Sequence, residues 1–299
     1  MKKIVLKWIS RILLVILLIL FMIAAYFLLI DIETKVPRKV ENSCYIETKQ
    51  FMSRNIFIIT LKNEEIKNDT VILYFHGGAY VAEATERHWD FIENIVKDTG
   101  ATVVLPDYPL TPKYNYKDVF KMVIPLYKEI IDRVDSNNLI LMGDSAGGGL
   151  GLALEEKISE ELLPLPTKTI LISPWLDVRL NNEEIDVVQA SDKQLNKDTL
   201  KLAGISYAGE DGIDNYLVNP IDGKLANLGN IVILTGTNDI LNPDVHVLLE
   251  KARKDGIGIE LKEYEGAAHI WMIEKNSNEE LVNKGYQDIL NLIRNNQSD

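Results

Sequence analysis

Short apolar runs alternate with amphipathic stretches along most of this 299-residue chain, and this alternation limits the possible folds more than any other feature. The runs are continuous, which is typical of strands buried on both faces of a parallel sheet. The stretches between them carry apolar residues at helical spacing. We therefore expect an α/β fold with helices on both faces of a mostly parallel sheet. We place its strands within residues 55–60, 71–75, 101–108, 138–143, 168–175, 230–236 and 258–266.

The first thirty residues differ from the rest of the chain. Residues 12–30, ILLVILLILFMIAAYFLLI, are nineteen residues without a charge. As a helix rising about 1.5 Å per residue, they nearly span a bilayer core of roughly 30 Å. A cleaved signal peptide is the nearest alternative, but its apolar region is usually about 7–15 residues long and ends at small residues. The one pair of small residues, Ala24 and Ala25, lies inside the run, so we expect an uncleaved transmembrane anchor over residues 1–30.

The orientation of this anchor depends on the charges beside it. Four basic residues precede it without an acid, whereas the four that follow soon after are mixed with acids. Lys and Arg beside a membrane segment favour the cytoplasmic side, and acids count for little. The numbers of basic residues on the two sides are equal, so we base the orientation on the denser charges before the segment. We expect a cytoplasmic N-terminus and an extracytoplasmic domain.

The charge and the cysteine content exclude some classes of protein. The formal net charge is −12, and the first thirty residues hold four of the 32 basic residues but none of the 44 acidic ones. The remainder therefore carries −16, which repels nucleic acid. A single cysteine excludes an intramolecular disulfide and a cysteine-based zinc site.

Two segments do not follow the strand–helix rhythm. Residues 31–69 look like a connecting and N-terminal segment before an α/β domain at 70–299. Within that domain, residues 178–222 interrupt the alternation. We expect this insertion to form a small cap over the carboxyl edge of the sheet, where ligands bind in such folds. A peripheral helical decoration is the alternative.

A serine lies in a G-x-S-x-G pattern between a predicted strand and a predicted helix. Ser145 stands between Gly143 and Gly147, in the sequence LMGDSAGGG. A sharp strand-to-helix turn exposes a nucleophilic serine, and it needs small neighbours such as Ala146. A phosphate-binding loop is the alternative, but it would need a lysine after the glycines, and none is present. The pattern therefore predicts a nucleophile.

A second glycine pair follows the strand predicted at 71–75. Gly77 and Gly78 lie in YFHGGAY, upstream of the serine turn. Consecutive glycines let main-chain N–H groups turn toward a developing oxyanion. An ordinary tight turn is the alternative, but the position at the end of a neighbouring strand favours an oxyanion loop.

A serine nucleophile needs a base, and the chain has four histidines. His76 belongs to the glycine loop, His88 begins a predicted helix, and His246 lies within another. His269 follows the last predicted strand in a loop of small residues, YEGAAHIWM, where catalytic groups are expected. We therefore predict His269 as the base.

The acid that orients the base should follow the preceding strand. Asp239 and Asp244 both lie in NIVILTGTNDILNPD. Asp239 is nearer the strand end. Asp244 follows Pro243 and fits the first turn of a helix, where an acid is favoured without any role in catalysis. We predict Asp239 as the acid and keep Asp244 as the alternative.

Taken together, these segments resemble the hormone-sensitive-lipase-like branch of the α/β hydrolases, with the matches in the family's order. They are HGGA at 76–79, DYPLTP at 107–112, GDSAGG at 143–148, SPWLD at 173–177, TNDIL at 237–241 and AAHIW at 267–271. The resemblance implies a serine carboxylesterase without metal or cofactor, with Ser145, Asp239 and His269 as its triad. It also implies Gly77, Gly78 and Ala146 as oxyanion donors. The chain departs from the family at Ala79, usually a third glycine, and at Pro109, commonly a basic residue.

We therefore expect a membrane-anchored serine esterase that acts on short- to medium-chain, acetyl-type esters of small molecules through an acyl-enzyme. An acyltransferase that uses the same site to modify a sugar or wall polymer is one alternative. A non-catalytic binding protein with a hydrolase fold is another. The sequence does not predict the oligomeric state.

Overall fold

The computed structural model describes residues 12–13, 15–19, 22, 34–62, 68–276 and 278–295. The chain divides into two compact units, Met1–Ile32 and Glu33–Asp299. Much of the anchor expected at 12–30 lies outside the described residues. The residues of this segment that the structure describes are helical. Their large apolar side chains are 47% to 68% exposed. No helix within the described ranges has both the length and the apolar character needed to cross a membrane.

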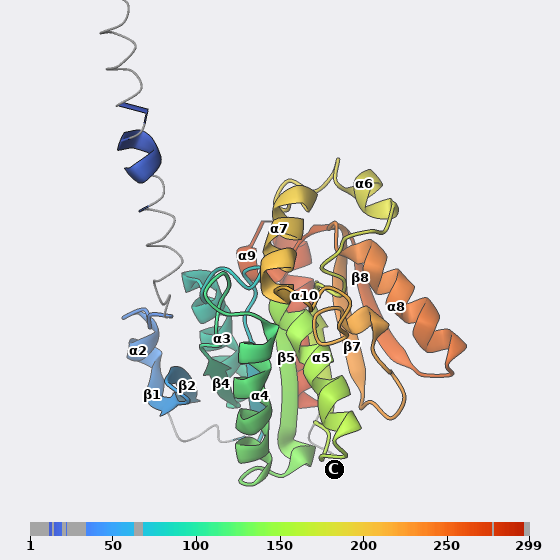
Figure 1. Ribbon diagram of the computed structural model, residues 1–299. Coiled ribbons are helices and arrows are strands. Elements are labelled where there is room, and N and C mark those ends of the chain that lie inside the picture. Colours follow the sequence, from blue (N-terminus) through green and yellow to red (C-terminus); the bar gives the residue numbers. More distant parts are fainter. Residues whose placement is uncertain are drawn as a thin grey trace, which may run out of the picture. The chain divides into compact units, whose positions relative to one another are not determined.

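The second unit is built on one eight-stranded sheet (Figure 1). Its strand order is β1-β2-β4-β3-β5-β6-β7-β8. From β4 to β8 neighbouring strands are parallel, whereas β2 is antiparallel to both β1 and β4. The strands are β1 (Cys44–Phe51), β2 (Arg54–Leu61), β3 (Val71–Phe75), β4 (Thr102–Pro106), β5 (Leu139–Asp144), β6 (Lys168–Ile172), β7 (Ile231–Asn238) and β8 (Ile259–Ala268).

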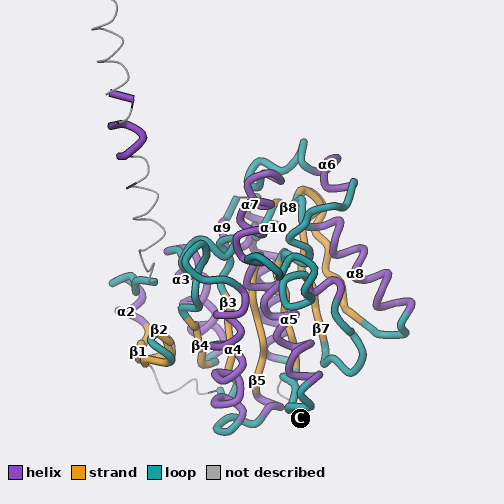
Figure 2. The backbone as a smooth tube through the Cα atoms, in the orientation of Figure 1, coloured by secondary structure: helices purple, strands orange, loops and turns teal. Residues whose placement is uncertain are grey.

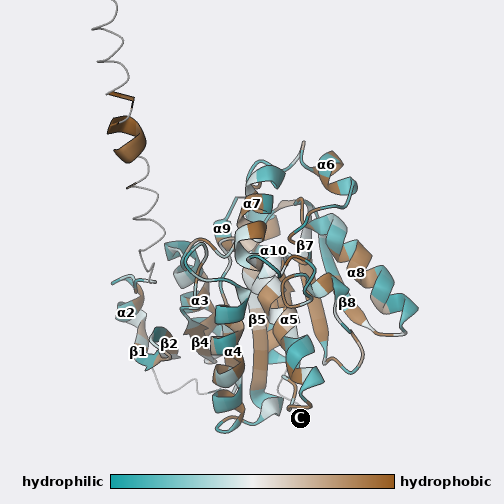
Figure 3. Cartoon of the chain, in the orientation of Figure 1, coloured by the Kyte–Doolittle hydropathy of each residue, from teal (hydrophilic) through white to brown (hydrophobic). Residues whose placement is uncertain are grey.

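Helices cover both faces of this sheet, as Figure 2 shows. On one face α3 (Glu86–Thr99), α9 (Trp271–Glu274) and α10 (Glu279–Arg294) pack against one another. The other face carries α4 (Tyr116–Ile131), α5 (Ala146–Glu160) and α8 (Asn242–Lys254). In Figure 3 the central strands β5 and β7 are hydrophobic, whereas α4 and α8 each carry hydrophilic residues.

Alternate residues of the central strands enter two separate cores. In β6, Ile170 and Ile172 join the core beneath α3 and α10, while Leu171 joins the core beneath α5 and α8. The same alternation continues in β7, where Leu171 pairs with Ile233. Both faces are therefore apolar, which explains the continuous apolar runs of the sequence.

The segment expected to connect the anchor and the domain contributes to the sheet instead. It holds the short helix α2 (Val40–Ser43) and the strands β1 and β2. Strand β2 was predicted from the sequence, whereas β1 was not. Most of β1, CYIETKQF, is exposed or half-buried, so this edge strand lacks the apolar run that identified the others.

The insertion at 178–222 contains α6 (Glu184–Val188), α7 (Lys197–Ala208) and the 3₁₀ turn Pro220–Asp222. It contacts loops at the carboxyl edge of the sheet. The Tyr207 ring of α7 stacks on Tyr80, which follows β3, with centroids 3.6 Å apart. The main-chain N–H of Ile240, which follows β7, donates to Asp192 Oδ2 at 3.0 Å. The insertion therefore adjoins this edge of the sheet, and its role as a cap stays a prediction.

A buried carboxyl group on α5 makes the stability of this fold depend on pH. Glu156 is 4% exposed, and neither of its carboxyl oxygens has a hydrogen-bond partner among the described residues. Burial raises the pKa of Glu156 to about 9, although the charge of Lys251 opposes the shift. The folded protein therefore holds a proton that the unfolded chain releases near pH 4.5.

We predict that Glu156→Gln abolishes a fall in stability that the native protein shows as the pH rises. In the native protein the free energy of unfolding falls as the pH rises from about 4.5 to about 9, because the unfolded state binds fewer protons than the folded state. Thermal melts should nearly coincide at pH 5, and the variant should melt higher at pH 8. Glu160→Gln, at an exposed position of the same helix, should keep the native slope. Parallel stability curves for the native protein and Glu156→Gln would contradict the assignment.

Candidate active site

Ser145 occupies a strained turn between β5 and α5. Its backbone angles are φ 53° and ψ −122°, a region that residues with a side chain rarely adopt. A Cβ on Gly147 would lie 2.0 Å from the carbonyl oxygen of Phe75, and one on Gly143 would lie 2.4 Å from that of Gly147. The two glycines of the pattern are therefore required by close backbone approach.

The structure brings the three predicted triad residues into one hydrogen-bonded chain. The Oγ of Ser145 lies 2.9 Å from Nε2 of His269, and Nδ1 of His269 lies 2.8 Å from Oδ2 of Asp239. An ionised carboxylate only accepts hydrogen bonds, so Nδ1 carries the proton and Nε2 is free to accept from the serine hydroxyl. All three residues are buried, with exposures of 6%, 3% and 0% for Ser145, His269 and Asp239.

The surroundings of His269 favour its charged form. Burial lowers the pKa of His269, but the charge and hydrogen bond of Asp239 outweigh burial, and the charges of Asp192 and Asp144 act in the same direction. The net effect raises the pKa above the ordinary histidine value. An imidazole in this position can accept a proton, and the nearby carboxylates then stabilise the imidazolium that forms.

The alternative acid lies outside this chain of hydrogen bonds. Asp244 accepts from the side chain of Asn182 in the insertion, at 3.0 Å. Burial raises the pKa of Asp244 to about 6. The carboxylate that contacts His269 is Asp239, so Asp244 instead helps to hold the insertion on α8.

The other three histidines have separate partners. His246 pairs with Glu263 at 2.7 Å. The Nδ1 of His76 donates to the carbonyl oxygen of Gly77 at 2.7 Å, and burial lowers the pKa of His76 to about 4. His88 contacts Asp144. None of these three contacts involves Ser145 or Asp239.

The glycine loop corrects one prediction. The N–H of Gly77 donates to Asp144 Oδ1 at 3.1 Å, so it is already occupied. The chain then turns through positive φ angles at Gly78 and Ala79. Within the described part of the chain, no hydrogen bond takes the N–H of Gly78, Ala79 or Ala146. The unoccupied donors are therefore Gly78, Ala146 and, in place of Gly77, Ala79.

Two contacts near the site were not predicted from the sequence. Asp192 of the insertion supports the loop that carries Asp239, through the N–H of Ile240. Tyr74 donates to Asp144. Neither contact could be predicted from a sequence pattern, because each joins segments far apart in the chain.

Known proteins resemble this chain in sequence and in structure. The family model described as alpha/beta hydrolase fold matches residues 72–273. An esterase from Acinetobacter venetianus is 28% identical over 220 residues, which is 71% of this chain and 72% of that protein. An acetyl-hydrolase from Streptomyces hygroscopicus is 25% identical over 201 residues, 67% of each chain.

A solved structure shares the fold. The crystal structure of an esterase from the bacterial hormone-sensitive lipase family superposes with a TM-score of 0.79, at 23% identity and 86% coverage of each chain. The fold, with its serine turn at the carboxyl edge, defines an α/β hydrolase. The chain belongs to the α/β-hydrolase family that the model describes, and it shares its fold with this esterase of the hormone-sensitive lipase family. The protein is a carboxylic ester hydrolase.

We predict that Asp239→Asn lowers turnover by roughly ten-thousandfold, as an Asp→Asn change does in the serine protease triad, because the imidazole adopts the wrong tautomer. Asp244→Asn should have a much smaller effect, since Asp244 contacts Asn182 and not His269. Steady-state kinetics, with circular dichroism to show that both variants fold, compares them. An inactive Asp244→Asn beside an active Asp239→Asn would overturn the assignment.

Proposed function

We propose that this ester hydrolase cleaves short- to medium-chain, acetyl-type esters of small molecules through an acyl-enzyme on Ser145. The hydrogen-bonded chain of Ser145, His269 and Asp239 carries the proposal. The relatives support the substrate class, because they include an acetyl-hydrolase and an ethyl acetate hydrolase from Pseudomonas putida.

The reaction follows from the positions of these groups. His269 takes the proton of the Ser145 hydroxyl as Oγ attacks the ester carbonyl. Asp239 keeps Nδ1 protonated and stabilises the imidazolium. The proton then passes to the leaving alcohol. Water repeats the sequence on the acyl-enzyme, releasing the carboxylic acid and restoring Ser145.

The negative charge that develops on the carbonyl oxygen needs hydrogen-bond donors. The N–H groups of Gly78, Ala79 and Ala146 fill this role in the proposal, because they are unoccupied and lie on the turns that flank Ser145. Ala146 also begins α5, whose positive dipole end favours an anion. One donor of this kind is typically worth roughly a hundredfold to a thousandfold in turnover.

The proposal includes attachment to a membrane through residues 12–30, with the domain outside the cytoplasm. Its support is the uncharged run of nineteen residues and the exposure of the apolar side chains described there. Exposed apolar side chains in such number are unfavourable in water and favourable in lipid.

We predict that Ser145→Ala abolishes hydrolysis, lowering turnover by up to roughly a millionfold. The full chain, purified in detergent, should be assayed on nitrophenyl esters from acetate to palmitate. Ser159→Ala, on the same helix as the serine turn, is the matched control and should keep native activity.

Near-native turnover by Ser145→Ala would sink the assignment. A native enzyme that hydrolyses no ester of the panel, but transfers acetyl groups to an added sugar, would instead establish the acyltransferase. Binding without turnover in both assays would establish the non-catalytic alternative.

We predict that residues 12–30 remain on the mature chain and retain it in the membrane. Mass spectrometry of the membrane fraction should recover peptides from the first thirty residues. Protease added to intact cells should digest the domain, whereas a cytoplasmic marker protein should survive. A mature N-terminus after Ala25 would show a signal peptide instead.

A further inference from the structure

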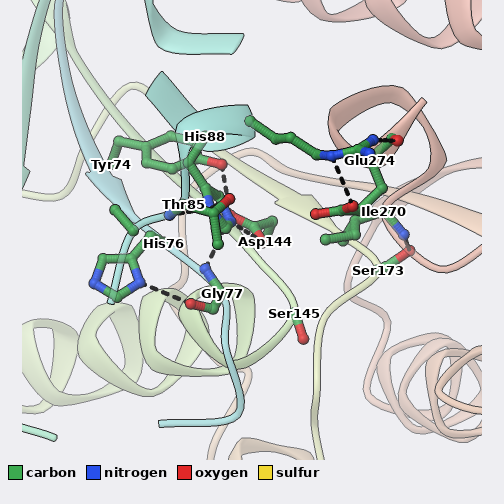
Figure 4. A network of polar contacts seen from close by, with 12 residues as sticks. Tyr74, His76, Gly77, Thr85, His88, Asp144, Ser145, Ser173, Ile270 and Glu274 are labelled. Carbon is green, nitrogen blue, oxygen red and sulfur yellow. Dashed lines mark hydrogen bonds and ion pairs between the residues drawn. The ribbon is translucent and has the colours of Figure 1, made fainter. Parts of the chain in front are cut away.

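Asp144, the residue before Ser145, is fully buried and joins three elements of the fold (Figure 4). Its Oδ1 accepts from the hydroxyl of Tyr74 on β3 at 2.5 Å and from the N–H of Gly77 at 3.1 Å. Its Oδ2 lies 3.2 Å from Nε2 of His88 on α3. None of these contacts belongs to the serine–histidine–aspartate chain.

The neighbours of His88 fix its tautomer. The N–H of Thr85, which caps α3, donates to Nδ1 of His88 at 3.0 Å. Because Nδ1 accepts this bond, neutral His88 carries its proton on Nε2, and it donates that proton to Asp144. A hydrogen-bonded series therefore runs from the N-terminus of α3 to the glycine loop.

The hydrogen bonds on Asp144 favour its carboxylate form. Burial alone would raise the pKa of Asp144, but His88 and the hydroxyl of Tyr74 outweigh burial and bring the pKa below its usual value. An ionised carboxylate accepts every bond offered here, including that of the main-chain N–H of Gly77.

The peptide of Gly77 is therefore held against the serine turn. A Cβ on Gly77 would lie 2.2 Å from Asp144 Oδ2 and 3.0 Å from Cβ of Ser145. Gly78 and Ala79, the next two residues, carry unoccupied N–H groups. Any displacement of Gly77 moves these donors relative to the nucleophile, because they follow it directly in the chain.

We propose that Asp144 is a positioning residue for the oxyanion loop and that His88 and Tyr74 hold it in place. The carboxylate fixes Gly77, and Gly77 sets the positions of the N–H groups of Gly78 and Ala79. The inference rests on the proposed serine-esterase function. It assigns to His88 a role in transition-state stabilisation without any contact with the substrate.

His88 offers a sharper test than Asp144, because a change of charge at Asp144 would also alter the electrostatic surroundings of His269. Two amide substitutions test the two hydrogen bonds of the imidazole, at Nε2 and at Nδ1, one at a time. In His88→Gln the amide NH₂ reaches about as far as Nε2, so the donor to Asp144 is kept. In His88→Asn the amide oxygen replaces Nδ1 as the acceptor for Thr85, but the donor to Asp144 is lost.

The readout must distinguish a displaced oxyanion loop from a general loss of structure. Oxyanion donors stabilise the transition state only, so their displacement lowers kcat and kcat/KM together and leaves KM unchanged. A thionoester supplies the same test independently, because sulfur is a poor hydrogen-bond acceptor. The ratio of kcat/KM for an ester to that for its thionoester therefore reports on the donors. Titration of active Ser145 with a fluorophosphonate corrects for misfolded enzyme.

We expect His88→Asn, in the full chain, to lower kcat by about tenfold to a hundredfold at unchanged KM, somewhat less than the loss of a whole donor. The ester to thionoester ratio should fall by a similar factor. His88→Gln should retain most of the activity and the native ratio. Tyr74→Phe, which removes one bond to Asp144 and keeps the ring, should lower the ratio in the same direction and by less.

A native ratio in His88→Asn, after correction for active enzyme, would overturn the proposal and leave His88 with a structural role. Equal losses in His88→Asn and His88→Gln would also overturn it. If His88→Asn does not fold, Tyr74→Phe decides, and an unchanged ratio there counts against the proposal. Failure of the proposed function is separate, because it would appear as near-native turnover by Ser145→Ala.

Discussion

The positive-φ turn at Ser145 is the constraint on which the rest of the site depends. A backbone conformation of this kind costs on the order of 1–3 kcal/mol and persists only where its surroundings over-determine it. Here the N–H of Ser145 donates to Ile172 on β6 at 2.9 Å, and its carbonyl oxygen accepts from Trp175 at 2.9 Å and Gly149 at 3.1 Å. The neighbouring strand and the following helix therefore both hold the turn. Hydrogen bonds of the Ser145 main chain therefore fix the turn, and the side chain is left free for other contacts.

The parallel sheet gathers the remaining groups around this turn. Because β3, β5, β7 and β8 are parallel, the loops that follow them share one edge. Those loops carry the unoccupied N–H groups of Gly78 and Ala79, together with Ser145, Asp239 and His269. Asp192 then reaches the loop after β7 from the insertion. Each group comes from a different segment, so the hydrophobic core that aligns the strands also determines the distances within the site.

Ser145, Asp239 and His269 could be predicted as a triad because each follows a predicted strand, with Ser145 and His269 among small residues. Ser145 and His269 could be placed in this way, and Asp239 could be separated from Asp244 by its distance from the strand end. Gly77 could not be assigned correctly, because the bond from its N–H to the Asp144 side chain joins two loops 67 residues apart. Strand β1 was missed for another reason: a half-exposed edge strand carries polar residues and lacks an apolar run.

The stacked rings of Tyr80 and Tyr207 join the insertion to the glycine loop. The rings are parallel within 3° and both are buried, and Tyr80 is the residue directly after Ala79 in the glycine loop. An outward swing of α7 must either separate the rings, at a cost of about 0.5–1.5 kcal/mol beyond the area exposed, or pull on the loop. The insertion and the glycine loop are therefore joined by a buried aromatic contact, and a displacement of one would strain the other.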